Sequence, residues 1–340
     1  MLRNKKLYVI YTGGTIGMKK SAVGYVPTPG LLTQLMSTMP EFNHPEMPSY
    51  TIHEYVPLID SANMQITHWE NIAQDIQINY EKYDGFIILH GTDTMAYTAS
   101  ALSFMFKHLS KPIILTGSQV PLMEAHTDAR ENLIMAMLMA ARYQIPEVCI
   151  YFNNRLLRGN RTQKVNAFSF AAFDSPNYPP LAEVGVNIKI RNELILPLKI
   201  EQQNLHVLPI KKLNIAQIML YPGFDFLTLE HFVTQSPDVL ILHTYGQGNA
   251  PTSNAQLLDN LKRLIDNGTI VINHTQCHKG GVEMKSYATG DALSKLGVLS
   301  AYNMTTEAVI TKIMVLLSQS YSKPQVVKKF SQSLVGELHH

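Results

Sequence analysis

The segment Lys5–Met18, KKLYVIYTGGTIGM, decides the fold of this 340-residue chain. Two charged residues lead into a β-branched and aromatic run, and a glycine-rich turn that contains Thr15 follows. A second segment, GFIILHGTDTM at Gly85–Met95, has the same order, with Thr92 and Asp93 in its turn. Short apolar runs of this kind are typical of buried strands, and ligands of open α/β sheets bind at the carboxyl ends of strands. The two segments therefore predict strands that deliver polar side chains to one site.

Strand and helix signals alternate along the N-terminal part of the chain. The motif Thr67-His68-Trp69-Glu70 predicts a capping box, and apolar residues at helical spacing after it predict a helix that ends near Tyr83. The other elements predicted in this part are strands at Thr51–Pro57, Gly85–Leu89, Pro112–Thr116 and Glu147–Phe152, and helices at Met95–His108 and Thr127–Tyr143. This alternating order indicates a mainly parallel, doubly wound sheet.

A second alternation follows an irregular, proline-containing stretch at 153–214. Its predicted elements, with two short strands inside the stretch itself, are strands at Val186–Ile190, Leu205–Ile210, Ala216–Leu220, Val239–His243 and Thr269–Asn273, and helices at Asp225–Gln235, Ser253–Asn267 and Glu307–Ser320. We therefore predict two doubly wound α/β domains. The larger, N-terminal domain spans 1–190, a linker spans 191–213, and a smaller Rossmann- or flavodoxin-like domain spans 214–340.

Composition places the chain among globular proteins and argues against several classes. Hydrophobic residues make up 46% and charged residues 16% of the chain, which permits a large core. The formal net charge is only +2 and basic residues are scattered, so we expect no nucleic-acid partner. No apolar stretch approaches membrane-spanning length, and none precedes the first strand, so we expect neither a membrane span nor a secretory signal.

Two cysteines, Cys149 and Cys277, argue against a disulfide scaffold and favour the reducing cytoplasm as the compartment. His274 and His278 lie near the second cysteine in a pattern that could ligate a metal, but no fourth ligand is apparent nearby. We therefore predict no metal. The glycine-rich turn after the first strand lacks the spacing of phosphate-binding loops, so we predict no nucleotide cofactor either.

The motifs resemble those of the bacterial Thr-Lys type of L-asparaginase, specifically the cytoplasmic type I form. TGGTIG at Thr12–Gly17 resembles the first family signature, and HGTDTMAYTASALSF at His90–Phe104 resembles the second. Three more segments follow in the family's order, TGSQVPL at Thr116–Leu122, SPNYPPLAEVG at Ser175–Gly185 and YGQGNAP at Tyr245–Pro251. The resemblance covers nearly the whole chain. It implies an amidohydrolase without a cofactor that converts L-asparagine to L-aspartate and ammonia through a threonyl ester.

Residue chemistry and the resemblance together predict a catalytic set. A threonine hydroxyl is a weak nucleophile at neutral pH and needs a neighbour that takes its proton. We predict that Thr15 forms the acyl-enzyme and that Tyr25, in a glycine-bracketed segment that resembles a mobile lid, activates it. Thr92 and Lys164 would then position and deprotonate the hydrolytic water. The resemblance implies that Asp93 also binds the α-amino group of the substrate, and which threonine attacks first stays open.

The head group of the substrate needs ligands of its own. In the family, an Asp-Ser pair at the position of Asp60-Ser61 holds the α-carboxylate. Ser61 can donate to a carboxylate, whereas an ionised Asp60 can only accept and so orients neighbours or the ammonium group. Gly91 and Ser118 complete the predicted substrate-binding set with Thr92 and Asp93. We expect Ser118 and Gln119 to buttress the site, and backbone N–H groups of the glycine-rich turns to meet the oxyanion.

Some cytoplasmic relatives carry an allosteric asparagine site that uses an arginine before the YG-x-GNAP motif and a cysteine after it. Here His243 takes the position of the arginine, Cys277 matches the cysteine, and Gln163 replaces a threonine. Loss of the arginine removes a bidentate contact to a carboxylate, so we predict weakened, pH-dependent or absent allostery. Relatives also assemble as dimers of close pairs, which implies a homodimer or homotetramer in which Asn249 reaches the partner's site.

Alternative functions stay open from the sequence. A glutaminase-asparaginase would accept a substrate one methylene longer, a difference usually worth only about 1–3 kcal/mol in a pocket. The archaeal subunit of the tRNA-dependent amidotransferase shares the tandem motifs, although the low net charge argues against it. An asparagine-binding or sensing protein without turnover would keep Asp93 and Ser61 but tolerate loss of Thr15 or Lys164, and both of these are present.

Overall fold

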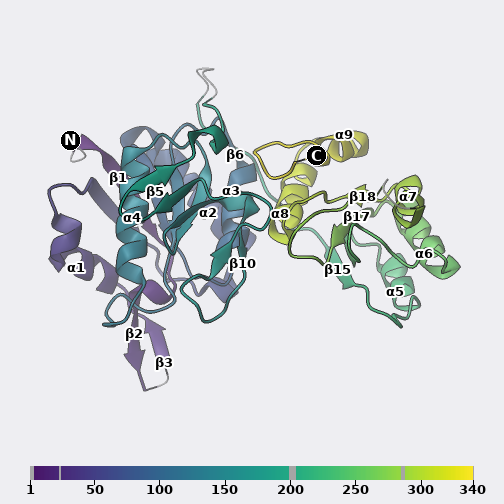
Figure 1. Cartoon of the computed structure of the whole chain (residues 1–340), viewed down its shortest axis with the longest axis horizontal. Helices are drawn as coiled ribbons and strands as arrows, with labels where there is room; N and C mark the ends of the chain where they lie inside the picture. Colours follow the sequence, from purple (N-terminus) through teal and green to yellow (C-terminus); the bar gives the residue numbers. More distant parts are fainter. Residues whose placement is uncertain (1–3, 23, 199–203, 285–287, 340) are drawn as a thin grey trace. The chain divides into compact units, whose positions relative to one another are not determined.

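The structure is a computed structural model, and it describes residues 4–22, 24–198, 204–284 and 288–339. The chain divides into two compact units, Met1–Ile210 and Lys211–His340, and each contains a sheet with helices (Figure 1). The prediction of an α/β fold with a large, mainly parallel sheet and a smaller parallel sheet is confirmed. Among the described residues, no helix is long and apolar enough to cross a membrane.

The first unit is built on an eight-stranded sheet with the order β13-β12-β9-β8-β7-β5-β1-β4. The strands are β1 (Lys6–Tyr11), β4 (Ser49–Glu54), β5 (Gly85–Leu89), β7 (Ile113–Thr116), β8 (Val148–Phe152), β9 (Arg155–Arg158), β12 (Ala182–Val184) and β13 (Ile188–Ile190). The five strands from β4 to β8 run parallel, and the remaining three pair antiparallel. Asn153 and Asn154 join β8 to β9 with positive φ angles of 46° and 61°, as a two-residue hairpin requires.

Four helices accompany this sheet, α1 (Leu31–Thr38), α2 (Ile66–Asn79), α3 (Met95–Met105) and α4 (Ala129–Arg142). Alternate residues of β1, β5, β7 and β8 form one apolar core with α1 and α4, because successive side chains of a strand point to opposite faces. Helix α3 packs against β7 and β8 and is buried along most of its length. The central strands are therefore apolar throughout, as expected for a parallel sheet covered by helices.

The predicted capping box before α2 is wrong. The helix begins at Ile66, so Thr67 already lies in its first turn. Gln65 is the N-cap, and its backbone N–H donates to Nδ1 of His68 at 3.0 Å, while its side chain accepts from the backbone of His68. Gln65 and His68 thus form the capping box in place of the predicted Thr67 and Glu70, because a glutamine oxygen and a neutral imidazole nitrogen can both accept a backbone N–H.

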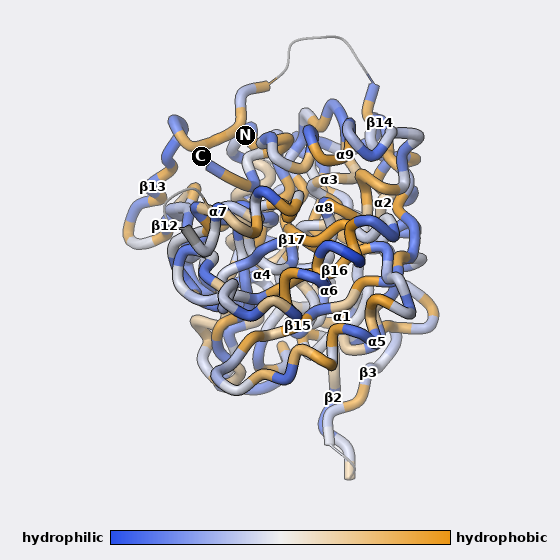
Figure 2. Tube along the Cα trace, turned by 90° about the vertical axis from the view of Figure 1, so that its right-hand side faces the viewer, coloured by the Kyte–Doolittle hydropathy of each residue, from blue (hydrophilic) through white to orange (hydrophobic). Residues whose placement is uncertain are grey.

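Short strand pairs complete the first unit: β2 (Met18–Ser21) with β3 (Gly24–Pro27), β6 (Phe106–Lys107) with β14 (His206–Val207), and β10 (Gln163–Lys164) with β11 (Phe173–Asp174). The β2–β3 hairpin protrudes from the body of this unit in both ribbon views (Figure 1, Figure 2). The hairpin carries Tyr25, and β10 carries Lys164, so two of the predicted catalytic residues lie on these small elements and not on the central sheet.

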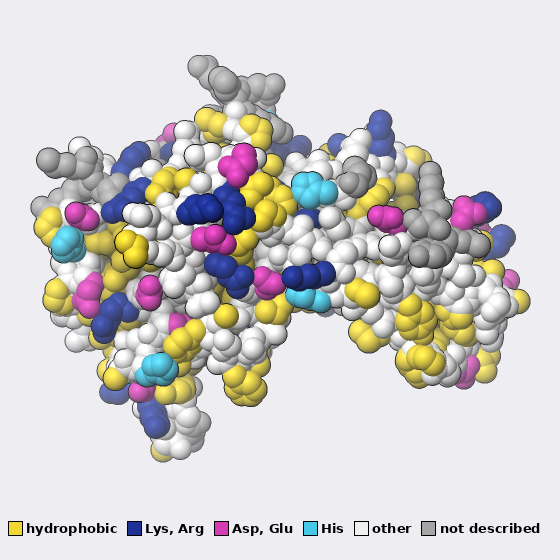
Figure 3. Space-filling model, viewed as in Figure 1, with side chains coloured by type: hydrophobic (Ala, Val, Ile, Leu, Met, Phe, Trp, Pro, Cys, Tyr) yellow, Lys and Arg dark blue, Asp and Glu magenta, His cyan; other side chains and the backbone are white. Residues whose placement is uncertain are grey.

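The second unit holds four parallel strands in sequence order, β15 (Ile215–Met219), β16 (Val239–Thr244), β17 (Ile270–Thr275) and β18 (Leu299–Ser300). Its helices are α5 (Thr228–Gln235), α6 (Ala255–Asp266), α7 (Ala288–Lys295), α8 (Thr306–Leu317) and α9 (Lys323–Phe330). Strand β16 (VLILHT) begins with four apolar residues and strand β17 (IVINHT) with three, and both end in polar residues. On the face drawn in Figure 3, acidic and basic side chains are interspersed across both units.

Candidate active site

Four neighbouring parallel strands end at one edge of the large sheet. In the order β4, β1, β5 and β7, they are followed by the segments that carry Asp60-Ser61, Thr15, Thr92-Asp93 and Ser118-Gln119. Because the carboxyl ends of parallel strands meet at the same edge, this topology gathers chemistry from four separate parts of the chain. The backbone N–H of Ile59 donates to the carbonyl of Thr12 at 2.7 Å and so ties the first two of these segments together.

Glycines allow three of these segments to touch. Gly14 has a φ of 93°, and a Cβ atom there would lie 2.5 Å from the Cα atom of Gly91. A Cβ atom on Gly91 would in turn lie 2.7 Å from the Cβ atom of Ser61. Side chains cannot approach so closely, so these positions require glycine. The turn before Thr15 therefore lies directly against the turn before Thr92.

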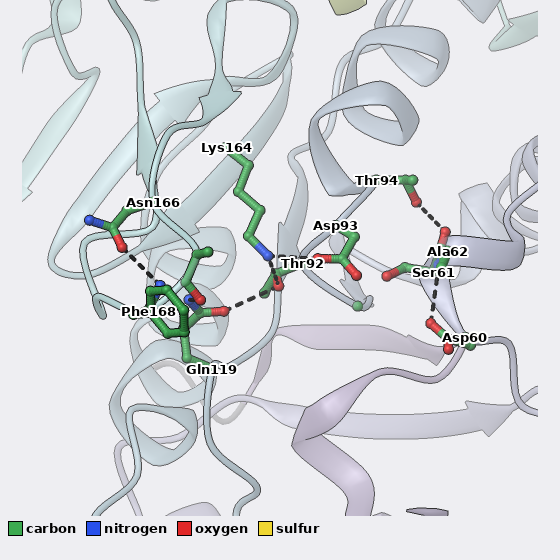
Figure 4. Close-up of polar contacts among 12 residues, drawn as sticks. Asp60, Ser61, Ala62, Thr92, Asp93, Thr94, Gln119, Lys164, Asn166 and Phe168 are labelled. Carbon is green, nitrogen blue, oxygen red and sulfur yellow. Dashed lines mark hydrogen bonds and ion pairs between the residues drawn. The ribbon is translucent and has the colours of Figure 1, made fainter. Parts of the chain in front are cut away.

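A lysine, a threonine and an aspartate form the polar centre of the site (Figure 4). Nζ of Lys164 donates to Oγ1 of Thr92 at 2.8 Å and to Oδ1 of Asp93 at 2.7 Å. The Lys164 side chain is 19% exposed and the Asp93 side chain 62% exposed, so the carboxylate is the open end of the pair. An exposed carboxylate beside a held ammonium can accept a further cation, such as the α-amino group of an amino acid.

Ser118 and Gln119, which follow β7, lie next to this polar centre. Oγ1 of Thr92 donates to Oε1 of Gln119 at 3.2 Å, and Thr92 is buried. Oγ of Ser118 is buried as well, and within the described part of the chain it has no hydrogen-bond partner. Ser118 is therefore placed in the wall of the site with an uncommitted hydroxyl.

The first threonine and the tyrosine are not in contact. Thr15 begins a short 3-10 turn at the end of β1 and is half-buried. Tyr25 is 45% exposed on β3, and its hydroxyl donates to Oε1 of Glu124 at 3.2 Å. Among the described residues, no hydrogen bond joins Tyr25 to Thr15. The structure thus brings Thr92, Asp93 and Lys164 together but leaves Tyr25 on the projecting hairpin.

The Asp-Ser pair is held by local contacts. The Asp60 side chain caps a short 3-10 turn by accepting the backbone N–H of Ala62 at 3.1 Å. The carbonyl of Ser61 accepts the Thr94 hydroxyl at 2.7 Å, and Ser61 is buried against Gly91 (Figure 4). Asp60 acts here as an acceptor that shapes the turn, while the Ser61 hydroxyl is the group of the pair that can donate to a carboxylate.

His90 is a contributor to the site that the sequence analysis did not assign. It is fully buried, and burial lowers its pKa to about 4, so the ring is neutral at neutral pH. Nδ1 lies 2.7 Å from the carbonyl of Gly91 and Nε2 lies 2.8 Å from the Thr98 hydroxyl, which also accepts from the Trp69 indole. A carbonyl only accepts, so Nδ1 carries the proton and fixes the peptide before Thr92. The sequence does offer a sign of this role, since His90 is a polar residue directly after the apolar strand β5.

The predicted allosteric residues lie in the second unit. Nε2 of His243 is 3.1 Å from Oε1 of Gln217, and burial, aided by the nearby His274, lowers the His243 pKa to about 4. Cys277 is exposed and has a free thiol. Within the described part of the chain, no group of three or more His, Cys, Asp or Glu side chains could hold a metal ion.

Fold and site together define an α/β enzyme whose mainly parallel sheet ends at a cluster of hydroxyl, lysine and carboxylate groups. A family model for the N-terminal domain of asparaginases matches residues 6–196, and a model for the glutaminase/asparaginase C-terminal domain matches residues 214–330. The chain therefore belongs to the asparaginase family and is an amidohydrolase that acts on linear amides. The resemblance predicted from the two threonine motifs is confirmed.

Full-length relatives agree with this assignment. The chain is 50% identical to L-asparaginase 1 of Escherichia coli strain K12 over 99% of both chains. The crystal structure of L-asparaginase I from Vibrio cholerae superposes with a TM-score of 0.92 at 48% identity and covers 99% of both chains. The thermostable L-asparaginase from Thermococcus kodakarensis gives a TM-score of 0.88 at 30% identity, over 98% of this chain and 99% of that one.

Proposed function

We propose that this chain hydrolyses L-asparagine to L-aspartate and ammonia through a threonyl ester. The observation that carries the proposal is the contact of Lys164 with both Thr92 and Asp93, beside a turn that lies against the turn of Thr15. This arrangement supplies a second hydroxyl, a proton-carrying amine and a site for the substrate ammonium next to a candidate nucleophile.

Two covalent steps account for the reaction. Oγ1 of Thr15 bonds to the side-chain carbonyl carbon of asparagine, the C–N bond breaks, and the threonine proton leaves with the ammonia. Water then bonds to the ester carbon, the bond to Oγ1 breaks, and one water proton returns to Thr15. In the structure the Tyr25 hydroxyl donates to Glu124 and not to Thr15. In this proposal the β2–β3 hairpin therefore closes first, and Tyr25 then takes part in the first step. Thr92 and Lys164 position the water of the second step.

The head group is bound by the polar groups around this centre. Asp93 accepts the α-ammonium group, since its carboxylate is more exposed than its lysine partner. Ser61 donates to the α-carboxylate, with Asp60 shaping the turn that presents it. Gly91 and Ser118 line the site, and the uncommitted Ser118 hydroxyl is available to the substrate or to an ordered water.

Steady-state ammonia release tests the proposal. We expect turnover of L-asparagine and much slower turnover of L-glutamine, measured in parallel over a wide concentration range. The longer substrate costs about 1–3 kcal/mol in a fitted pocket, which corresponds to about 10–200-fold in kcat/KM. Comparable rates with both amides would identify a glutaminase-asparaginase, and no turnover of either would favour a binding or sensing protein.

We also propose that asparagine does not regulate this chain strongly through a second site. An imidazole with a pKa of about 4 is uncharged at neutral pH, so His243 offers no cation to an effector carboxylate. The rate against asparagine concentration is expected to be hyperbolic at neutral pH, and His243→Arg is expected to make it more sigmoidal. A Gln217→Ala variant, which removes only the neighbour of His243, is the matched control. A sigmoidal curve for the unsubstituted protein would contradict the prediction.

The remaining proposals concern compartment and assembly. Cys149 is buried and Cys277 exposed, both as free thiols, which suits a reducing cytoplasm. We propose a homodimer or homotetramer in which Asn249 contributes to the partner's site. Oδ1 of Asn249 accepts from the Thr289 hydroxyl at 2.7 Å, which orients the amide within its own unit. Light scattering coupled to gel filtration would give the oligomeric state.

A further inference from the structure

Gln119 has a side chain whose orientation is fixed by its neighbours. Nε2 of Gln119 lies 3.2 Å from the carbonyl oxygens of both Ala167 and Ser169. A carbonyl oxygen can only accept a hydrogen bond, so the amide nitrogen must face these two groups. The amide oxygen must therefore face the other way, toward Thr92 (Figure 4).

This orientation settles the direction of the Thr92 hydroxyl. Because Oε1 of Gln119 has no proton to give, the Thr92 hydroxyl donates to it, at 3.2 Å. The lone pairs of Oγ1 then remain for Nζ of Lys164, which donates at 2.8 Å, and for a further donor in the site. A threonine without such an acceptor could rotate its O–H bond toward the substrate.

The same amide also holds the segment that follows the lysine. Residues 165–171 run directly on from Lys164 and close on themselves, because Oδ1 of Asn166 accepts the backbone N–H groups of Phe168 and Ser169, each at 2.8 Å. The two carbonyls that Gln119 binds lie inside this turn. Gln119 therefore contacts Thr92 by one end of its amide and the segment after Lys164 by the other.

Gln119 is itself anchored away from the site. Its backbone N–H lies 3.0 Å from both carboxylate oxygens of Asp128, and the backbone N–H of Val120 donates to the same carboxylate at 3.1 Å. Asp128 is the N-cap residue of α4, so the anchor belongs to a helix that packs on the central sheet and not to the segment that Gln119 binds after Lys164. A side chain fixed at its base and at both amide atoms suits a positioning role.

We propose that Gln119 is a positioning residue for the second half of the reaction, and that it keeps the Thr92 oxygen directed toward Lys164 and the hydrolytic water. This inference rests on the proposed function. In that half-reaction the water oxygen bonds to the ester carbon, the bond to Oγ1 of Thr15 breaks, and Thr15 recovers a proton. Gln119 touches none of the reacting atoms and acts through Thr92.

Gln119→Met tests the proposal, since methionine has a similar length but neither donates nor accepts strongly. We expect kcat for asparagine to fall about 10–100-fold while kcat/KM changes less, because a slow second step makes the acyl-enzyme accumulate. A burst of ammonia, one per active site, should precede the slower steady state. Hydroxylamine, which attacks the ester in place of water, should restore much of the lost rate.

Asn166→Ala is the matched control, because it removes the acceptor that closes the turn at 165–171 and leaves the Gln119 side chain, with the oxygen that Thr92 needs, in the protein. If Gln119 only stabilised that turn, both variants would lower kcat and kcat/KM equally and neither would show a burst, which would overturn the inference. An unchanged kcat in Gln119→Met would overturn it as well. If the unsubstituted protein itself releases no ammonia, the proposed function fails first and the inference falls with it. Thermal unfolding of each variant distinguishes misfolding from these results.

Discussion

Thr15→Ala is expected to lower kcat for asparagine by about 10³-fold or more, and to leave an enzyme that still binds its substrate. The expectation follows from where the threonine lies. Gly14 packs directly against Gly91, so the turn that carries Thr15 adjoins the turn that carries the hydroxyl of Thr92. In the proposed mechanism, removing this hydroxyl removes the atom that bonds to the substrate, while the proposed head-group ligands Asp93 and Ser61 remain. Thr15→Ser, which keeps a hydroxyl, should retain more activity.

The same experiment can decide which threonine attacks first. If Thr15 forms the ester, Thr92→Ala should still release ammonia in a first turnover and should accumulate an acylated protein that mass spectrometry detects after acid quenching. Thr15→Ala should show neither. The reverse pattern, with a first turnover in Thr15→Ala and none in Thr92→Ala, would assign the nucleophile to Thr92 and would refute the order of steps proposed above.

The strands that organise the site were predictable because their sequences are locally unambiguous. β1 and β5 are short apolar runs that end in glycine-rich turns, and both form as predicted. The start of α2 was misjudged because a glutamine and a histidine can cap a helix as well as the expected threonine and glutamate, and propensity favours the latter. Helix α9 was missed, since its short sequence KPQVVKKF has few apolar positions.

The contacts within the site depend on tertiary structure and could not be read from spacing. Lys164 lies in a two-residue strand far along the chain from Thr92, and nothing local in its sequence indicates that the two meet. Gln119 was expected to buttress the site, but the orientation of its amide depends on two carbonyls some 50 residues away in the sequence. Tyr25 was expected to reach Thr15 through a lid, and only the structure shows its hydroxyl on Glu124.

A buried ion pair in the second unit gives the largest expected effect on stability. Lys312 on α8 and Glu337 near the end of the chain are both completely buried, and Nζ of Lys312 lies 2.5 Å from Oε1 of Glu337. Lys312 also donates to the carbonyls of Phe330 and Gln332, each at 2.7 Å. Glu337 accepts the backbone N–H of Val335 at 2.8 Å. The pair thus joins the chain after α9 to the core of the unit.

Glu337→Gln is expected to lower the free energy of unfolding by about 3–5 kcal/mol, because it leaves the lysine charge buried without its counter-charge. The amide has the shape of the carboxyl group, so lost packing does not explain the change. Denaturant unfolding followed by circular dichroism measures it. Lys312→Met alone should be costly too, whereas Lys312→Met combined with Glu337→Gln should recover much of the loss, since no buried charge remains.

The pH dependence of this loss identifies its cause. Burial lowers the pKa of Lys312 below its ordinary value, and the charge and hydrogen bond of Glu337 oppose that shift. Without the carboxylate the pKa of Lys312 in the folded chain falls further, so between that pKa and the ordinary pKa of lysine the unfolded chain binds a proton that the folded chain has released. Stability then rises with pH wherever the unfolded state binds more protons, up to the ordinary pKa of lysine. The deficit of Glu337→Gln should therefore shrink between about pH 7 and pH 10. A deficit that stays constant over this range would show that the carboxylate acts through its hydrogen bonds to the backbone and not through its charge.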